Sequence, residues 1–331
     1  MCTAISYRAG GHFFGRTLDL DCSYTEQITI TPRQYPYPFR HRAMLKTHYA
    51  ILGMATATAE QPLYYDAVNE KGLCMAGLNF PGNAVYLPPA SGWDNVTAFE
   101  LLPLILGTCE TVLQAKERLK HLRIVNTPYA PEMPLTPLHW LLADGEHSLV
   151  IEPTADGLQI YDNPAAVLTN NPPFPQLASR LVDYMHLTPK PPKNRFAPTI
   201  PLTPYSHGLG AVGLPGDFSS PSRFVRAAFH LHNAAPDGIE EERIRQVFHI
   251  LRTVFIPRGS VRLGDGRYHH TLYAACLHAE AGVYYVSTHL NSRICGIDMH
   301  RTDLNGTKPM CYPLPAVEPF PILNSTAPPL C

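Results

Sequence analysis

The chain has 331 residues, and its 26 Lys and Arg residues nearly balance its 27 Asp and Glu residues. This balance argues against nucleic acid and against an acidic membrane surface as partners, because both are recognised through basic patches. The longest apolar stretch, AFELLPLILGTC, contains Glu100 and Pro103 and is well short of the ~20 residues that span a membrane, so we expect a soluble protein.

The N-terminus and the cysteines favour a cytoplasmic location. The first residues lack the basic flank, apolar run and cleavage site of a secretory signal. Eight cysteines are scattered without a CxxC pair, which predicts neither a zinc site nor a disulfide framework. Apart from Cys2, we expect each of them to be a small buried hydrophobic residue: Cys22, Cys74, Cys109, Cys276, Cys295, Cys311 and Cys331.

Strands are predicted at both ends of the chain. Residues 2–8, 12–18 and 26–32 alternate between apolar and polar side chains, as half-buried strands do. Two further strand pairs are expected, at residues 147–153 with 157–162 and at residues 271–278 with 283–289.

Helices are predicted between these strands. Thr97 and Glu100 have the spacing of a capping box ahead of the apolar run 98–105. Ser220 and Pro221 suit the cap and first turn of a helix that continues to residue 232. A second helix follows each of these, as indicated by the apolar stripes Val112, Ala115, Leu119 and Ile244, Val247, Ile250, Val254.

These patterns predict an α+β fold in which helices cover antiparallel sheet. A parallel doubly wound fold is disfavoured, because a βαβ alternation and a GxGxxG fingerprint are absent. The proline-rich residues 187–204 could be a linker, but strand patterns on both sides favour a long surface connection within one domain, residues 1–331.

The opening hairpin could carry chemistry. If the two glycines at positions 10 and 11 form a two-residue turn, the register places Cys2 opposite Asp19, with Cβ atoms about 5 Å apart. Strict alternation then places Arg16 on the opposite face from Asp19. Removal of Met1 would give Cys2 both a thiol and a free α-amine.

Such a cysteine can be a self-contained nucleophile and base. The pKa of a free thiol is about 8.5 and that of an α-amine roughly 7.7 to 8.0, so the amine can accept the thiol proton. Arg16 would lower the thiol pKa, and Asp19 could orient the ammonium group. The alternative is a buried structural Cys2 on an edge strand, with Arg16 and Asp19 as a surface ion pair.

Two asparagine-bearing turns could stabilise an oxyanion. Asn79 lies in AGLNFPG, and Asn170 and Asn171 lie in LTNNPPF, each after a strand-like run. Loss of one oxyanion donor typically costs about 100- to 1000-fold in rate. Ordinary turn chemistry explains the same asparagines equally well.

Taken together, these segments resemble the choloylglycine hydrolase family, which groups bile salt hydrolases with penicillin V acylases among the N-terminal nucleophile hydrolases. The resemblance rests on eight blocks in order along most of the chain: MCTAISY, FGRTLDLD, ITITPRQY, NEKGLCMAGLNFPG, LHWLLADG, VLTNNPPF, GLPGDFSSPSRFVR and LGDGRYHHTLY. It implies a four-layer αββα sandwich with antiparallel sheets.

The resemblance also implies the site. Its residues would be Cys2 as nucleophile, Arg16 and Asp19 as polar neighbours, Asn79 and Asn170 as oxyanion donors, and Arg223 in SPSRF. Asn170 is assigned in preference to its neighbour because it follows Thr169 directly. The asparagine in GLNF favours the bile salt hydrolases, since penicillin V acylases often carry tyrosine there.

The implied activity is hydrolysis of glycine- or taurine-conjugated bile acids, such as glycocholate and taurocholate, through a Cys2 thioester and without a metal or cofactor. The family also implies a homotetramer. Alternatives are a penicillin V acylase or N-acyl homoserine lactone acylase of the same family, which hydrolyse the amide of those compounds, and a catalytically silent ligand-binding protein that retains Met1. Candidate pocket residues lie around Phe80 and Pro81, in the Tyr24 region and in the YPYPF segment at residues 35–39.

Overall fold

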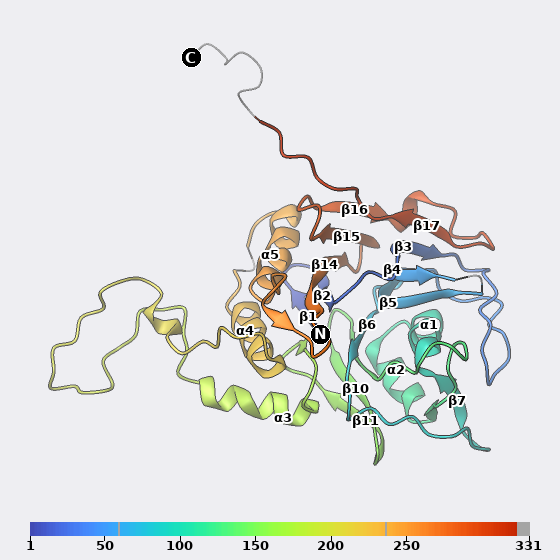
Figure 1. Cartoon of the computed structure of the whole chain (residues 1–331), viewed down its shortest axis with the longest axis horizontal. Helices are drawn as coiled ribbons and strands as arrows, with labels where there is room; N and C mark the ends of the chain where they lie inside the picture. Colours follow the sequence, from blue (N-terminus) through green and yellow to red (C-terminus); the bar gives the residue numbers. More distant parts are fainter. Residues whose placement is uncertain (59, 236, 323–331) are drawn as a thin grey trace, which may run out of the picture.

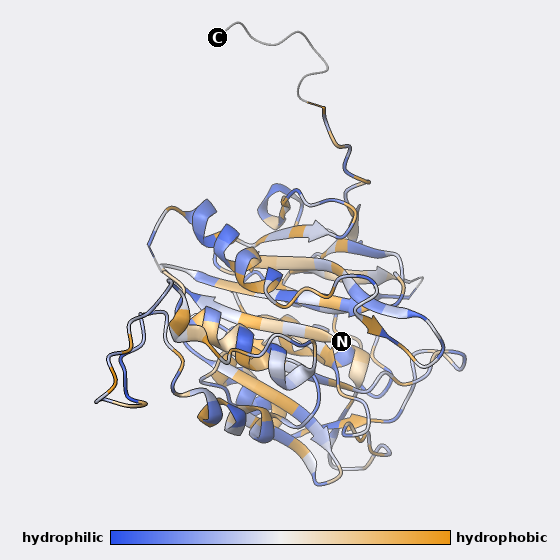
Figure 2. Ribbon diagram, turned by 60° about the vertical axis from the view of Figure 1, so that its left-hand side comes forward, coloured by the Kyte–Doolittle hydropathy of each residue, from blue (hydrophilic) through white to orange (hydrophobic). Residues whose placement is uncertain are grey.

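The computed structural model describes residues 1–58, 60–235 and 237–322. Two antiparallel sheets pack face to face, and helices cover the outer face of each sheet (Figure 1). Hydrophobic colouring follows the central strands, whereas hydrophilic colouring dominates the surface loops (Figure 2). This is a four-layer αββα sandwich, so the predicted α+β fold class is confirmed.

The first sheet begins with the chain itself. Within the described ranges its order is β12, β1, β2, β14, β15 and β16, with β13 paired to β14. The bounds are β12 (Val167–Leu168), β1 (Cys2–Arg8), β2 (His12–Leu20), β14 (Tyr268–His278), β15 (Val283–Thr288), β16 (Cys295–Asp298) and β13 (Val261–Arg262).

The second sheet lies against the first. Its order among the described residues is β11 (Gly157–Asp162), β10 (Ser148–Thr154), β9 (Leu138–Ala143), β6 (Cys74–Asn79), β5 (Pro62–Asn69), β4 (Ile51–Ala57), β3 (Glu26–Thr31) and β17 (Met310–Pro313). A short parallel pair, β7 (Asp94–Thr97) and β8 (Leu122–Val125), lies beside it.

Helices α1 (Ala98–Thr108) and α2 (Val112–Leu119) pack on the second sheet. Helices α4 (Ser220–His232) and α5 (Glu240–Arg252) pack on the first, and α3 (Phe174–Ser179) follows β12. Among the residues that the structure describes, three short 3-10 helices cover Arg180–Tyr184, Leu209–Ala211 and Met299–Arg301. The predicted strand pairs and helices are therefore confirmed, and residues 187–204 form the expected surface connection without a strand or helix.

The helix caps match the prediction at one helix and differ at the other. The Glu100 carboxylate accepts a hydrogen bond from the Thr97 N–H at 3.0 Å, as the capping-box spacing predicted. The cap of α4 is Ser219 rather than Ser220, and its hydroxyl accepts from the Ser222 N–H at 3.4 Å. The N–H groups of the first helical turn have no acceptor within the helix. Pro221, which lacks an N–H, therefore fits the second helical position as well as the first, and the helix can start one residue earlier.

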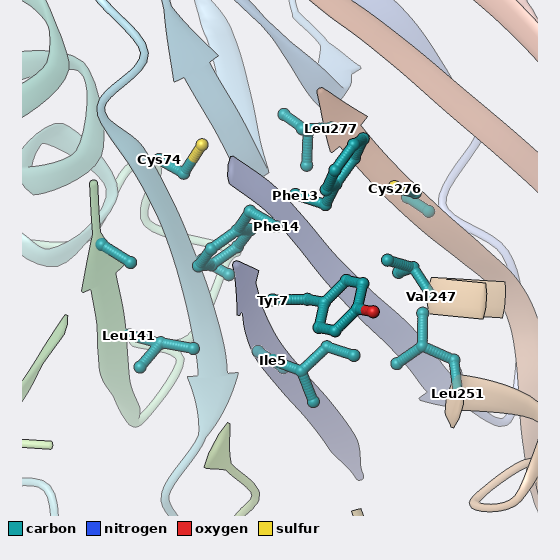
Figure 3. Close-up of a cluster of buried hydrophobic side chains, with 14 of the residues drawn as sticks. Ile5, Tyr7, Phe13, Phe14, Cys74, Leu141, Val247, Leu251, Cys276 and Leu277 are labelled. Atoms are coloured by element: carbon teal, nitrogen blue, oxygen red, sulfur yellow. The ribbon is translucent and has the colours of Figure 1, made fainter. Parts of the chain in front are cut away.

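The two faces of β1 and β2 have different surroundings. Phe14 lies toward Leu141 of the second sheet, whereas Tyr7 lies toward Val247 of α5 (Figure 3). Because side chains alternate along a strand, even-numbered residues here face the second sheet and odd-numbered residues face the helices. Gly15 lies on the helix face, where an added Cβ would come within 2.6 Å of Val247 Cγ1.

The turn between β1 and β2 differs from the prediction. Its loop has three residues, Ala9, Gly10 and Gly11, since Arg8 pairs with His12. A two-residue type I′ turn needs positive φ at both central residues, and of the two glycines only Gly10 has one, at 59°.

The longer loop shifts the register by one residue, so Cys2 pairs with Leu18 and not with Asp19. Asp19 instead faces Met1, whose amine donates to the Asp19 carbonyl oxygen at 2.5 Å. The predicted pairing of Cys2 with Asp19 is therefore wrong. The predicted placement of Arg16 and Asp19 on opposite faces is confirmed by the alternation of β2.

Not all cysteines are buried as predicted. Cys74, Cys109 and Cys276 are buried, but three others are exposed: Cys22, Cys295 and Cys311. The reason is position, because Cys22 lies in the turn after β2 and the other two lie on the edge strands β16 and β17. Cys331 lies outside the described residues, and the seven described cysteines are free thiols.

Candidate active site around Cys2

Cys2 is the first residue of β1 and is 3% exposed. Its backbone N–H donates to Asn170 Oδ1 at 2.9 Å. Asn170 comes two residues after β12, which pairs with β1 through Ala4 and Leu168. The antiparallel pairing of these two strands therefore brings the N-terminal cysteine and the asparagine together across 168 residues of chain.

The side chain of Asn170 has a fixed orientation. Its oxygen accepts from the Cys2 N–H and from Arg223 Nη2, the latter at 2.7 Å, and neither partner can accept a hydrogen bond. Its nitrogen donates to the Asn79 carbonyl oxygen at 2.7 Å. The amide nitrogen of Asn170 therefore points toward the Asn79 turn, and its second hydrogen is left for another acceptor.

Arg223 comes from the first turn of α4 and is fully buried. Its Nη1 donates to the Cys2 carbonyl oxygen at 2.5 Å and to Thr3 Oγ1 at 2.7 Å. Burial lowers the pKa of this guanidinium, and the negative charges of Asp19 and Cys2 oppose the shift. Arg223 thus adds positive charge beside Cys2 from the helix side.

Arg16 approaches from the other side. It lies on the even-numbered face of β2, which it shares with Cys2, and its side chain is fully buried between the sheets. Its Nη1 donates to the carbonyl oxygens of Tyr65 and Gly77 at 3.0 and 3.2 Å and lies 3.5 Å from Asp66 Oδ2. Its Nη2 is buried without a hydrogen-bond partner among the described residues.

Asp19 faces the helices. Its carboxylate accepts hydrogen bonds from the hydroxyls of Thr17 at 3.1 Å and Thr271 at 2.6 Å. It makes no hydrogen bond to the Cys2 thiol among the described hydrogen bonds. Its negative charge instead acts on Arg223, where it opposes the lowering of the guanidinium pKa by burial. A bulge in β14 opposite Leu18 and Asp19 places Thr271 within reach of this carboxylate.

Asn79 ends β6, and its backbone carbonyl receives the Asn170 amide. Within the described residues its own side-chain amide makes no hydrogen bond, so both of its hydrogens are free to donate. The structure therefore joins Cys2, Asn170, Arg223 and Asn79 through a chain of hydrogen bonds. Arg16 and Asp19 lie on opposite faces of the strand beside them.

Sequence reasoning missed the groups that support this set. The Asp66 carboxylate accepts hydrogen bonds from the hydroxyls of Tyr273 and Tyr284, each at 2.7 Å, and it faces Arg16. Ser220 Oγ accepts from the Asn170 N–H at 2.8 Å. The available signal was an isolated aspartate within the apolar strand pattern of residues 62–69, since a buried charge requires a partner.

The candidate pocket residues are only partly where the sequence suggested. Phe80 is fully buried and stacks on His139, and Tyr24 is 54% exposed. Tyr35 and Tyr37 pack in the core between the second sheet and α1, away from Cys2. The predicted role of the residues 35–39 in the pocket is therefore wrong for these two rings, because that segment crosses the outer face of the second sheet.

No helix in the described part of the chain is long and apolar enough to cross a membrane. The described residues also contain no group of three or more His, Cys, Asp or Glu side chains arranged to hold a metal ion.

Comparison with known proteins decides the family. The family model for linear amide C–N hydrolases, choloylglycine hydrolase family, matches residues 2–312. The chain belongs to the choloylglycine hydrolase family. As a member of this family of linear amide C–N hydrolases it is an enzyme that hydrolyses amides.

Individual relatives agree with the family model. The chain is 45% identical over 314 residues to a bile salt hydrolase/transferase of Lactiplantibacillus plantarum, covering 95% of this chain and 97% of that protein. A mutant conjugated bile acid hydrolase from Clostridium perfringens superposes with a TM-score of 0.90 at 34% identity, covering 98% of this chain and 100% of that chain. Penicillin V acylase from Agrobacterium tumefaciens shares the choloylglycine hydrolase fold, with a TM-score of 0.75 at 20% identity over 95% and 92% of the two chains.

Proposed function

We propose that this protein hydrolyses the amide bond of glycine- or taurine-conjugated bile acids, with Cys2 as the nucleophile after removal of Met1. The observation that carries the proposal is the contact of the Cys2 nitrogen with Asn170, inside a chain 45% identical to a bile salt hydrolase/transferase. Once Met1 is removed, that nitrogen becomes an α-amine held beside its own thiol.

The chemistry follows from these two groups. The neutral α-amine takes the thiol proton, and the Cys2 sulfur forms a bond to the amide carbon of the conjugate. The tetrahedral intermediate then expels glycine or taurine, whose nitrogen takes the proton from the Cys2 ammonium. Water attacks the resulting thioester with the same amine as base, which releases the free bile acid and restores the thiol.

We assign stabilisation of the oxyanion to Asn79 and Asn170. The Asn79 amide has both hydrogens free among the described contacts, and the Asn170 amide has one hydrogen beyond its bond to the Asn79 carbonyl. The Asn170 amide is held by hydrogen bonds at its oxygen and at one hydrogen, so this donor needs no reorganisation when negative charge develops on the substrate oxygen. Arg16 and Arg223 then favour the thiolate from the two faces of β1, and Asp19 balances the charge of Arg223.

The test combines turnover with the mass of the intact chain. Purified protein is incubated with glycocholate, taurocholate and penicillin V, and released amino acid or 6-aminopenicillanic acid is measured. Release from the bile salts by a chain without Met1 supports the proposal. If a chain without Met1 releases no product, the bile salts and penicillin V are not its substrates. Release of 6-aminopenicillanic acid from penicillin V alone favours the penicillin V acylase alternative. A chain that retains Met1 and hydrolyses nothing shows only that the Cys2 amine was never uncovered, which the binding-protein alternative requires.

A transferase activity is a second candidate, because the Lactiplantibacillus plantarum relative is named a hydrolase/transferase. The same Cys2 thioester can be attacked by the amine of a second amino acid instead of water. Incubating glycocholate with an excess of a different amino acid and measuring the new conjugate by mass spectrometry tests this activity. Absence of a new conjugate during active hydrolysis would reject it.

We also infer that each chain forms a single domain, that four chains associate as a homotetramer, and that the protein is cytoplasmic. The long connection of residues 185–219 protrudes from the body of the molecule (Figure 1) and carries exposed Phe196 and Tyr205, which are 90% and 87% exposed. Exposed aromatic side chains of this kind favour association with another copy. Light scattering tests the tetramer against the 36.7 kDa chain, and cell fractionation tests the location.

A further inference from the structure

A buried histidine and glutamate lie behind the two turns that carry Asn79 and Asn170. His139 is the second residue of β9, and its Nδ1 is 3.0 Å from Glu152 Oε1 of β10. We propose that these two are positioning residues, which hold both asparagine turns in the geometry that amide hydrolysis requires. The proposal rests on the oxyanion role assigned above to the two asparagines.

The ring of His139 contacts both turns. Its Nε2 is 2.9 Å from the carbonyl oxygen of Thr169, the residue directly before Asn170. One face of the ring stacks on Phe80, the residue directly after Asn79, with centroids 4.3 Å apart and planes inclined by 5°. A single rigid side chain thus sets the position of both candidate oxyanion donors from behind.

The hydrogen-bond partners of the two ring nitrogens of His139 determine which nitrogen carries a proton. A carbonyl oxygen only accepts hydrogen bonds, so Nε2 carries a proton and donates to Thr169. Nδ1 then shares a second proton with the Glu152 carboxyl group. Both side chains are fully buried, where an unpaired ring nitrogen or carboxylate would be costly, so each requires the other.

Glu152 extends the support to the far end of the Asn170 turn. Its carboxyl oxygens accept from the Phe174 N–H at 3.0 and 3.2 Å, where α3 begins. The segment 169–174 is therefore held at both ends by one connected pair. Neither His139 nor Glu152 contacts Cys2 in the described hydrogen bonds, so their effect on the reaction passes through the asparagines.

The consequence for the reaction is specific. Attack on an amide creates an oxyanion that must meet both donors, and a misplacement of about 1 Å can cost ~100-fold in rate. Alkylation of the Cys2 thiol by iodoacetamide creates no oxyanion. Loss of the pair should therefore lower kcat for hydrolysis and leave the alkylation rate and its pH profile unchanged.

The test compares two variants of the full chain. E152Q keeps an acceptor for the Phe174 N–H and a donor for the imidazole, so it serves as the matched control. The double variant H139F/E152Q keeps an aromatic ring against Phe80 and leaves no buried charge, but it loses the bond to Thr169. We expect kcat of the double variant to fall about 100-fold, with KM within about twofold and E152Q within about threefold of the parent.

Hydrogen exchange read by mass spectrometry supplies a measurement that needs no substrate. In the double variant, peptides covering residues 78–84 and 168–176 should exchange faster than in the parent and in E152Q. Unchanged exchange in both peptides overturns the proposal, as does an unchanged kcat, and so does a parallel loss of alkylation. If the parent hydrolyses no conjugate, the proposed function fails, and the exchange contrast decides the positioning by itself.

Discussion

Arg16 Nη1 lies 3.5 Å from Asp66 Oδ2, and both side chains are fully buried between the two sheets. Burial raises the pKa of the Asp66 carboxyl, and Arg16 and the hydroxyls of Tyr284 and Tyr273 oppose the shift. The ion pair with Asp66 holds the Arg16 guanidinium between the sheets, on the strand face that Arg16 shares with Cys2. Among the described residues, Nη2 of Arg16 is buried and has no hydrogen-bond partner.

Replacing Asp66 by Asn should leave the Arg16 charge buried without a counter-charge. Breaking a buried ion pair by removing one partner costs about 3 to 5 kcal/mol, so we expect the free energy of unfolding in urea to fall by about that amount. Tyr273→Phe removes one hydrogen bond to the same carboxylate, and as the matched control it should cost only about 1 kcal/mol. Equal losses in the two variants would argue against an ionic role for Asp66.

Asn79→Ala should lower kcat about 100- to 1000-fold and leave the free energy of unfolding nearly unchanged. The reason is that the Asn79 side chain makes no hydrogen bond among the described residues, so its removal breaks no structural contact. Asn170→Ala should lower kcat too, but it also breaks contacts with Cys2, Arg223 and Asn79. A fully active Asn79→Ala variant would remove Asn79 from the proposed oxyanion hole.

Cys2→Ala should abolish hydrolysis, because it removes the thiol. The fold should be retained, because the alanine methyl group fills part of the same buried space and the backbone N–H of residue 2 still donates to Asn170. Amino acid release and the circular dichroism spectrum are measured together. Cys2→Ser is the matched comparison, since it keeps a nucleophilic atom but one that is less reactive. Full turnover by Cys2→Ala would refute the thioester mechanism.

His12 should make the fold sensitive to mild acid. Burial lowers its pKa to about 4, against 6.5 in the unfolded chain. Between these values the unfolded state binds a proton that the folded state does not, so stability is lost as pH falls below 6.5. The loss from this group should reach about 2 kcal/mol at pH 5 in denaturant titrations.

The matched variants separate this effect from other titrating groups. His12→Gln should flatten the loss of stability between pH 7.5 and pH 5, because glutamine does not titrate. The exposed His207 is the control, and His207→Gln should leave the slope unchanged. Parallel slopes for the parent and His12→Gln would show that His12 is protonated equally in both states.

Gly15→Ala should destabilise the contact between β2 and α5. The new Cβ would lie 2.6 Å from Val247 Cγ1, and overpacking of this kind costs about 1 to 3 kcal/mol. Val247→Ala removes that methyl group, so the double variant should be more stable than the sum of the two single losses predicts. Strict additivity would show that the two positions do not meet.

The sequence alone determined the strands at residues 2–32, 147–162 and 271–289 and the helices α1, α2, α4 and α5, since apolar periodicity reflects which side of each element is buried. It did not predict the strands β4, β5 and β9 of the second sheet. The sequence pattern also pointed to Cys2, Asn79 and Asn170, and the family resemblance added Arg223; the fold brings these four residues together. Their proximity could not be read from spacing, because Cys2 and Arg223 are joined by a contact spanning 221 residues. That contact exists only when α4 packs on β1.

The tertiary structure decided the register of the first hairpin and the partners of the buried charges. The backbone angles of two glycines changed the loop by one residue, and this moved Asp19 from Cys2 to Met1. Asp66 and the pair of His139 and Glu152 resemble ordinary polar residues within strand patterns. Only packing of the sheets and loops buries them, and burial is what makes an unpaired charge costly enough to fix its partner.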